Sequence, residues 1–162
     1  MKTLLLMRHA KSSWKDATLS DRQRPLNKRG QRDAPEMGRC LRDKGIVFDR
    51  ILSSPARRAL NTAQLVAQAV GHLPEQIEQH EALYFTSTST MLALIQQLDE
   101  QYSTVMLVSH NPDISGLLQR LCRSETDDMP TAAVATLQFD RQWLDIHDGS
   151  GHLSDYDFPK SR

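Results

Sequence analysis

Thr3-Leu4-Leu5-Leu6-Met7-Arg8-His9 is a short apolar run that ends on a histidine, and Val105-Met106-Leu107-Val108-Ser109-His110 is a second one. Both runs have the length and the continuous apolarity of strands that are buried on both faces. In open α/β sheets the ligand crevice lies outside the carboxyl ends of the strands. The sequence therefore predicts that His9 and His110 meet in one pocket, with Arg8 beside the first of them.

Strand and helix patterns alternate along the rest of the chain and predict an α/β fold. Besides the two apolar runs, strands are expected over residues 48–53 and 75–80 and, as a β-hairpin, over 132–139 and 143–147. Apolar positions that recur every three or four residues predict helices over residues 27–44, 56–70, 87–101 and 112–121. This order of elements favours a three-layer sandwich, in which helices cover both faces of a mostly parallel central sheet.

Three local features of the sequence carry further expectations. Residues 10–26 are polar and irregular, and they are expected to form a long functional loop. Pro35 falls inside the pattern of the first helix, which favours a helix start near Asp33. The polar final dozen residues are expected to fray, and Trp143 is expected to pack within the hairpin.

Length and composition argue against several classes of protein. The 162 residues fit one domain, 1–162, and twenty basic residues balance twenty acidic ones, so the basic excess of a dedicated nucleic-acid binder is missing. The apolar run at the N-terminus is too short for a signal peptide or a membrane span, which favours a cytoplasmic protein without a membrane partner. Cys40 and Cys122 fall in apolar helical patterns and are expected to be reduced core thiols.

The ends of the predicted strands carry residues that suit phosphate chemistry. A neutral imidazole at His9 can attack phosphorus, and the guanidinium of Arg8 offers planar hydrogen bonds to phosphate oxygens. Arg58 lies in the first turn of a helix, where unpaired N–H groups already favour anions, whereas Arg57 is interpreted as a solvated residue. His110 is suited to donate a hydrogen bond to a phosphoryl oxygen or to move a proton.

Together these motifs resemble the histidine phosphatase superfamily. The resemblance rests on Leu6-Met7-Arg8-His9-Ala10, on Ser53-Ser54-Pro55 with Arg58-Ala59 and Thr62-Ala63, and on Ser109-His110-Asn111. The short length and Arg24-Pro25-Leu26 are most similar to the small bacterial phosphohistidine phosphatases of the SixA type. The resemblance spans residues 3–143 and implies a phosphoglycerate mutase-like fold.

The resemblance also implies a role for each matching residue. His9 matches the nucleophile that accepts the phosphoryl group, and Arg8, Arg58 and His110 complete the catalytic set. The residues implied to bind the phosphate are Arg8, Arg24, Arg58, His110 and Asn111.

The chain departs from the superfamily pattern in two places. Ala10 stands where glycine is usual, which matters only if that position needs a positive φ. The carboxylic acid that protonates the leaving oxygen in many members has no clear counterpart. The nearest candidate is Glu81, and Asp16 and Asp113 are further possibilities.

The missing acid bears on the substrate. Protonating an alkoxide leaving group in the transition state is worth about 10²–10⁴-fold. An imidazole, with a reference pKa of about 6.5, needs a dedicated acid much less. The pattern therefore favours phosphohistidine on a protein as the substrate, reached through a covalent phosphohistidine enzyme intermediate.

Two alternatives stay open: a phosphatase for small phosphate esters, and a non-catalytic module that binds phosphorylated partners. A generic phosphate-releasing assay with His9→Ala as control separates the module from an enzyme. The sequence has no His-x-His or His-Glu-x-x-His pattern, so a metal-independent reaction without another cofactor is expected.

Overall fold

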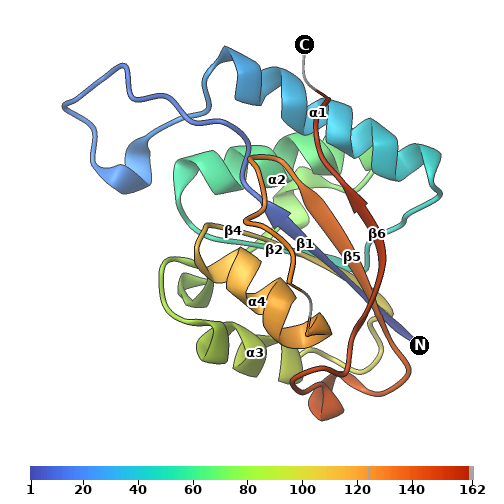
Figure 1. Ribbon diagram of the computed structural model, residues 1–162. Coiled ribbons are helices and arrows are strands. Elements are labelled where there is room, and N and C mark those ends of the chain that lie inside the picture. Colours follow the sequence, from blue (N-terminus) through green and yellow to red (C-terminus); the bar gives the residue numbers. More distant parts are fainter. Residues whose placement is uncertain (124, 161–162) are drawn as a thin grey trace.

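A six-stranded sheet runs through the middle of the molecule (Figure 1). The computed structural model describes residues 1–123 and 125–160. The strands are β1 (Lys2–Arg8), β2 (Arg50–Ser53), β3 (Glu78–Gln79), β4 (Thr104–Ser109), β5 (Val134–Phe139) and β6 (His152–Asp157). Their order across the sheet is β3-β2-β4-β1-β5-β6. The first four strands run parallel, β5 pairs antiparallel with β1, and β6 pairs antiparallel with β5.

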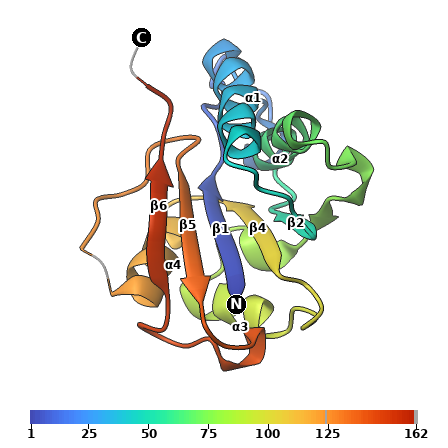
Figure 2. The same ribbon diagram turned by 90° about the vertical axis from the view of Figure 1, so that its right-hand side faces the viewer.

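Helices cover both faces of this sheet (Figure 2). They are α1 (Lys28–Asp43) and α2 (Arg57–Val70) on one face, and α3 (Thr88–Gln96) and α4 (Asp113–Cys122) on the other. The alternation of side chains along β1 fits this arrangement, since Leu5 and Met7 join the core under α1 and α2. Leu4 and Leu6 join the core under α3 and α4. The predicted three-layer α/β sandwich is confirmed.

The first helix begins earlier than Pro35 suggested. α1 starts at Lys28, so the expected start near Asp33 is wrong. The side chain of Asn27 accepts a hydrogen bond from the Gly30 backbone N–H at 2.8 Å and caps the helix. A proline inside a helix costs about 3 kcal/mol through a lost hydrogen bond and a ring clash. The cap and the buried helix face on both sides of Pro35 outweigh that cost.

Two predicted elements are present but shorter than expected. α3 ends at Gln96, because the carboxylate of Asp99 accepts a hydrogen bond from the Gln101 backbone N–H at 2.8 Å and turns the chain away from the helix. The edge strand predicted over 75–80 is reduced to β3, because a 3₁₀ turn, η2 (Pro74–Gln76), occupies its first half.

The C-terminal part of the chain differs most from expectation. Residues 143–147 do not form the second strand of a hairpin, because Trp143 starts a 3₁₀ turn, η4 (Trp143–Asp145), and is fully buried. Its backbone N–H donates to the Glu100 carboxylate and its indole N–H donates to the Tyr102 carbonyl, so these polar groups pair with the segment before β4 and not with a strand partner. β6 pairs with β5 instead and orders most of the segment expected to fray. Residues 161–162 lie outside the described part of the chain.

Two further sequence-based expectations concern the helices. Over residues 1–123 and 125–160, no helix combines the length and the apolar character needed to cross a membrane. Cys40 in α1 and Cys122 in α4 are both free and half-buried. Burial raises the pKa of the Cys122 thiol to about 11, so this cysteine stays protonated at neutral pH.

Candidate active site

The register between β1 and β4 brings the two histidines together. Arg8 pairs with Ser109 at the ends of these parallel strands, so His9 and His110 follow side by side. The His9 backbone N–H donates to the Ser109 carbonyl at 3.1 Å, which extends the pairing by one residue. The two imidazole centroids lie 5.0 Å apart, and the predicted meeting of the histidines is confirmed.

The end of β2 adds the second arginine to the same edge of the sheet. The Ser54 backbone N–H donates to the Val108 carbonyl at 2.9 Å, which continues the β2–β4 pairing into the turn. α2 begins three residues later and places Arg58 in its first turn, where this side chain is 1% exposed. Arg57 is exposed, as expected of a solvated residue.

The loop over residues 10–26 folds back across this edge and delivers Arg24. A β-bridge between Ser12 and Leu26 closes the base of the loop. The loop also lies tightly against α1, since a Cβ at Gly30 would fall 2.2 Å from the Lys11 carbonyl oxygen. The Arg24 guanidinium is buried and donates to Ser12 Oγ at 2.9 Å.

The imidazole of His9 is held with one nitrogen free. Nδ1 lies 2.7 Å from the Ala10 carbonyl oxygen, so Nδ1 carries the proton and Nε2 keeps its lone pair. Burial, together with the charges of Arg58, Arg8 and Arg24, lowers the pKa of His9 to about 4, although the hydrogen bond to Ala10 acts in the opposite direction. The imidazole of His9 is therefore neutral at physiological pH.

Alanine is tolerated after His9 because the backbone there is ordinary. Among the described residues other than glycine, only Phe85, Arg123 and Ala132 have a positive φ. The Ala10 backbone N–H donates to Thr62 Oγ1 at 3.0 Å, and that hydroxyl donates to the Arg58 carbonyl. The departure from glycine at Ala10 therefore leaves the site intact.

Ser54 fixes the proton of His110. Its Oγ lies 2.7 Å from His110 Nε2 and also accepts a hydrogen bond from the Ala56 backbone N–H at 3.2 Å. Because the Ser54 hydroxyl already accepts one hydrogen bond, its own proton is satisfied when it donates to His110 Nε2. Nε2 is then an acceptor, and the imidazole proton lies on Nδ1. Burial, followed by His9 and Arg58, lowers the pKa of His110 to about 2, so the ring is neutral. Nδ1 is buried and has no protein partner among the described residues.

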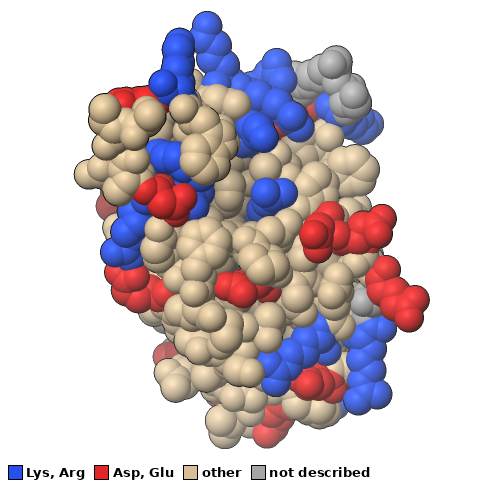
Figure 3. All heavy atoms as spheres, turned by 60° about the vertical axis from the view of Figure 1, so that its left-hand side comes forward, with Lys and Arg blue, Asp and Glu red and all other residues tan. Residues whose placement is uncertain are grey.

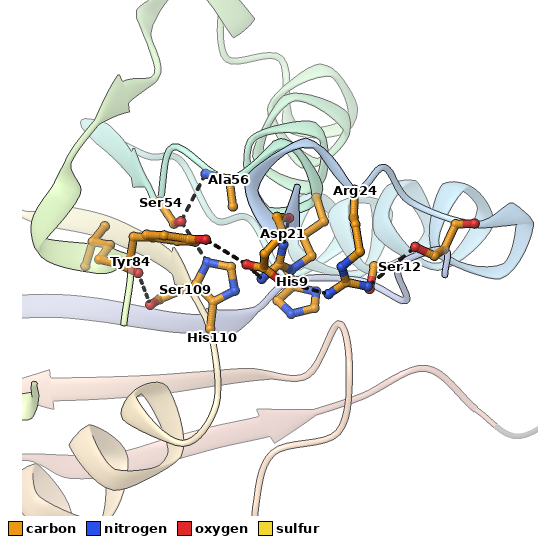
Figure 4. A network of polar contacts seen from close by, with 12 residues as sticks. His9, Ser12, Asp21, Arg24, Ser54, Ala56, Tyr84, Ser109 and His110 are labelled. Carbon is orange, nitrogen blue, oxygen red and sulfur yellow. Dashed lines mark hydrogen bonds and ion pairs between the residues drawn. The ribbon is translucent and has the colours of Figure 1, made fainter. Parts of the chain in front are cut away.

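Asp21 is the acidic residue at the centre of the network, in a 3₁₀ turn, η1 (Asp21–Gln23), within the long loop. Its carboxylate accepts hydrogen bonds from Arg58 at 3.0 Å and from the Tyr84 hydroxyl at 2.7 Å (Figure 4). Arg24 lies 3.4 Å away on the other side. Partial burial alone would raise the pKa of Asp21, but the Tyr84 and Arg58 contacts hold it at about 2. The side chain is therefore an ionised carboxylate.

Arg8 and Asn111 are tied to one backbone carbonyl. Arg8 Nη1 and Asn111 Nδ2 each donate to the Met129 carbonyl oxygen at 3.0 Å. Ser115 Oγ donates to Asn111 Oδ1 and accepts from the Met129 backbone N–H at 2.8 Å. Burial lowers the pKa of Arg8, against a raising influence from Asp128.

These side chains surround one open cleft of about 310 Å³ at the carboxyl ends of β1 and β4. Its lining consists of Arg8, His9, Lys11, Ser12, Trp14, Asp21, Arg24, Arg58, Phe85, His110, Asn111 and Thr131. Trp14 covers the Arg24 guanidinium carbon at 3.5 Å from the ring centre. Figure 3 shows Lys and Arg side chains gathered along the upper part of this side of the molecule. A larger cavity of about 490 Å³ lies at the opposite ends of these strands, where Lys44 pairs with Asp155.

Glu81, the nearest candidate for a general acid, is not among the residues that line the cleft. It begins a 3₁₀ turn, η3 (Glu81–Leu83), and its exposed side chain forms an ion pair with Arg22. The Arg22 contact lowers the pKa of the Glu81 carboxyl. The carboxylate that enters the cleft is that of Asp21.

The two buried histidines make the stability of the protein depend on pH. Both have a pKa below the ordinary 6.5 when folded, so the unfolded chain binds more protons between about pH 6.5 and pH 4. Stability is then full above that range and falls as the pH drops. We expect urea unfolding to show a loss of about 2 kcal/mol per imidazole between about pH 7 and pH 5.

Asp21 does not contribute in that range, because its carboxylate is ionised in both states above about pH 5. The double variant His9→Gln, His110→Gln should flatten the dependence. The exposed His152→Gln serves as a matched control and should leave the slope unchanged. Equal slopes for the native protein and the double variant would contradict neutral, buried histidines.

A family model described as the histidine phosphatase superfamily (branch 1) matches residues 4–84, half of the chain. The chain belongs to the histidine phosphatase superfamily. The matched segment contains Arg8, His9, Arg24 and Arg58.

Individual relatives match most of the chain. Phosphohistidine phosphatase SixA of Escherichia coli (strain K12) is 30% identical over 140 residues, 85% of each protein. An uncharacterized protein of Mycobacterium tuberculosis is 29% identical over 95% of this chain and all of its own length. The solved structure of the protein histidine phosphatase SixA complexed with tungstate superposes with a TM-score of 0.83, at 28% identity and 96% coverage of both chains.

These findings confirm the expected fold and the expectation of an enzyme. The chain is a phosphatase with a phosphoglycerate mutase-like α/β sandwich. All five residues expected to bind phosphate line the cleft together with His9, whereas Glu81 does not.

Sequence reasoning missed three residues of the network: Asp21, Ser54 as the partner of His110, and Phe85. Ser54 belongs to the motif Ser53-Ser54-Pro55. Its position one residue after β2 could have indicated that its side chain lies at the same edge of the sheet as His110. Asp21 and Phe85 lie in irregular segments, where the spacing of residues does not predict which way a side chain points.

Proposed function

We propose that this phosphatase removes the phosphoryl group from histidine side chains of proteins by way of a phosphohistidine intermediate on His9. The observation that carries the proposal is the pairing of a free Nε2 on a neutral His9 with a cleft whose lining contains one carboxylate, already ionised. The free Nε2 of His9 supplies a nucleophile for phosphorus. The ionised carboxylate decides which leaving groups can depart, because it has no proton to give.

The cleft suits a tetrahedral anion. Arg8, Arg24 and Arg58 each keep a buried Nε that has no protein partner among residues 1–123 and 125–160. His110 Nδ1 is a fourth buried nitrogen of this kind. Phosphoryl oxygens are acceptors that match such donors, and guanidinium groups suit them through planar, charge-assisted hydrogen bonds. Asn111 lies beside them and holds the same carbonyl as Arg8.

The reaction follows from these positions. His9 Nε2 donates its lone pair to phosphorus, and the bond from phosphorus to the leaving nitrogen breaks. The bonding electron pair stays on that nitrogen as the lone pair of a neutral imidazole, whose other ring nitrogen already carries the proton, so no acid is needed. Arg8, Arg24, Arg58 and His110 stabilise the charge on the transferring phosphoryl oxygens. Water then attacks the phosphorus of phospho-His9, so that inorganic phosphate leaves and the neutral imidazole returns.

The state of Asp21 supports a phosphoramidate rather than an alkyl phosphate as the substrate. A pKa near 2 leaves no proton on this carboxyl at neutral pH, while an alkoxide would need one. An imidazole leaving group is far less basic and departs without such help. The similarity to SixA, which is named a phosphohistidine phosphatase, agrees with this choice.

Turnover of two matched peptides tests the proposal. A peptide carrying phosphohistidine should have a kcat/KM about 10²-fold or more above that of the same peptide carrying phosphoserine, because only the alkoxide needs an acid. The spontaneous hydrolysis of each peptide is subtracted, and His9→Ala gives the enzyme blank. An equal or higher kcat/KM for phosphoserine would overturn the proposal and favour a phosphatase for small phosphate esters.

A further inference from the structure

Phe85 combines an unfavourable backbone conformation with an exposed aromatic ring. Its φ is 51°, in the left-handed region that glycine and asparagine occupy far more readily than aromatic residues. The side chain is 48% exposed, so burial in the core does not compensate for the strain. Strain of this kind persists mainly at functional sites, where the surrounding structure enforces it.

The surroundings place the ring at the mouth of the active site. Phe85 joins η3 to α3 and lines the cleft. Its ring centroid lies 4.6 Å from that of His110, with 30° between the planes, and 5.0 Å from that of Tyr84. The Arg58 guanidinium carbon is 5.9 Å from the ring. The strained residue therefore rests against two groups of the phosphate site and leaves much of its surface open.

We propose that Phe85 is a specificity-determining residue that forms a platform for a planar ring attached to the phosphoryl group. Phe85 lies beside His110 and Arg58, and all three line the cleft, so a ring attached to a phosphoryl group bound there can pack against the Phe85 ring. Aromatic rings attract one another in offset or tilted contacts beyond their simple burial. The inference rests on the proposed function, because in that function the planar ring is the imidazole of phosphohistidine.

Two phosphonates that cannot be hydrolysed test the platform without any turnover. Phenylphosphonate and cyclohexylphosphonate carry rings of similar size, and only the first is planar. Calorimetry should show that Phe85→Leu lowers the preference for phenylphosphonate by about threefold to tenfold, the value expected of one aromatic pair. Phe85→Tyr should keep the preference. Phe158→Leu is a matched control, because Phe158 is 49% exposed and is not among the cleft-lining residues.

A thermal unfolding measurement separates this role from a structural one. Asparagine tolerates a positive φ, so Phe85→Asn should unfold at the same or a higher temperature while the preference for the planar ring is lost. A lower unfolding temperature, or an unchanged preference in Phe85→Leu, would overturn the platform. The proposed function is tested by a different result, since it fails if the phosphoserine peptide is the better substrate. That result would not change the measured preference for phenylphosphonate.

Discussion

Replacing His9 with alanine should lower kcat/KM for the phosphohistidine peptide by on the order of 10⁵-fold, the scale of losing a covalent nucleophile. In the proposed reaction Nε2 of His9 receives the phosphoryl group, and the neighbouring His110 is not placed to replace it. Ser54 holds Nε2 of His110, whose Nδ1 carries a proton. A stopped assay of phosphate release measures the effect.

The His9→Ala variant should still bind phosphate, since the three arginines of the cleft remain. Ligand binding then shows as a rise in the unfolding temperature on adding phosphate. Added imidazole should restore part of the activity by filling the space of the lost ring. Activity comparable to that of the native enzyme would contradict a nucleophilic His9, and no release from any phosphorylated substrate by the native protein would favour the binding module.

Replacing Arg58 with alanine should give the second largest effect, a fall in kcat/KM of about 10²–10³-fold. The guanidinium is 1% exposed and comes from α2, opposite the groups that follow β1 and β4. Burial shields this guanidinium from water, so its hydrogen bond to the transferring oxygens in the proposed reaction should have a large effect. Steady-state kinetics on the phosphohistidine peptide measure the fall.

Two variants make the Arg58 result specific. Arg58→Lys keeps the charge but loses the planar pair of donors, so it should remain at least about tenfold below the native enzyme. Arg57→Ala removes the exposed neighbour on the same turn of α2 and should leave kcat/KM unchanged. A similar fall in Arg57→Ala and Arg58→Ala would mean that general positive charge, not the buried guanidinium, supports the reaction.

The parts of the site that follow regular strands were predictable from sequence. Continuous apolar runs indicate buried strands, and the carboxyl ends of parallel strands meet at one edge of the sheet. The sequence was therefore enough to predict that His9 and His110 lie close together. Arg58 could be preferred over Arg57 because it matched the family motif, and the structure buries one and exposes the other.

The parts that depend on irregular backbone were not predictable. Asp21 reaches Arg58 across 37 positions through a loop whose path no periodic pattern describes. Glu81 was the nearest candidate for the general acid, but its side chain forms an ion pair with Arg22. Phe85 shows nothing unusual in sequence, because a positive φ becomes visible only in the fold.

The same limit explains the error in the C-terminal strands. Trp143 to His147 have the composition of a strand, yet burial of the indole and the bonds from its backbone to Glu100 take this segment out of the sheet. β6 contains a serine, a histidine and two aspartates, and it forms because β5 offers an open edge. Long-range pairing of this kind overrides local propensity.

Trapping the intermediate shows whether the phosphoryl group passes through Nε2 of His9. The enzyme is mixed with phosphohistidine peptide, quenched in alkali within the first turnover, digested and mapped by mass spectrometry, with NMR to assign the ring nitrogen. We expect one phosphoryl group, labile to acid, on Nε2 of His9. A phosphoryl group on His110, or a first turnover that leaves the enzyme unmodified, would contradict this expectation.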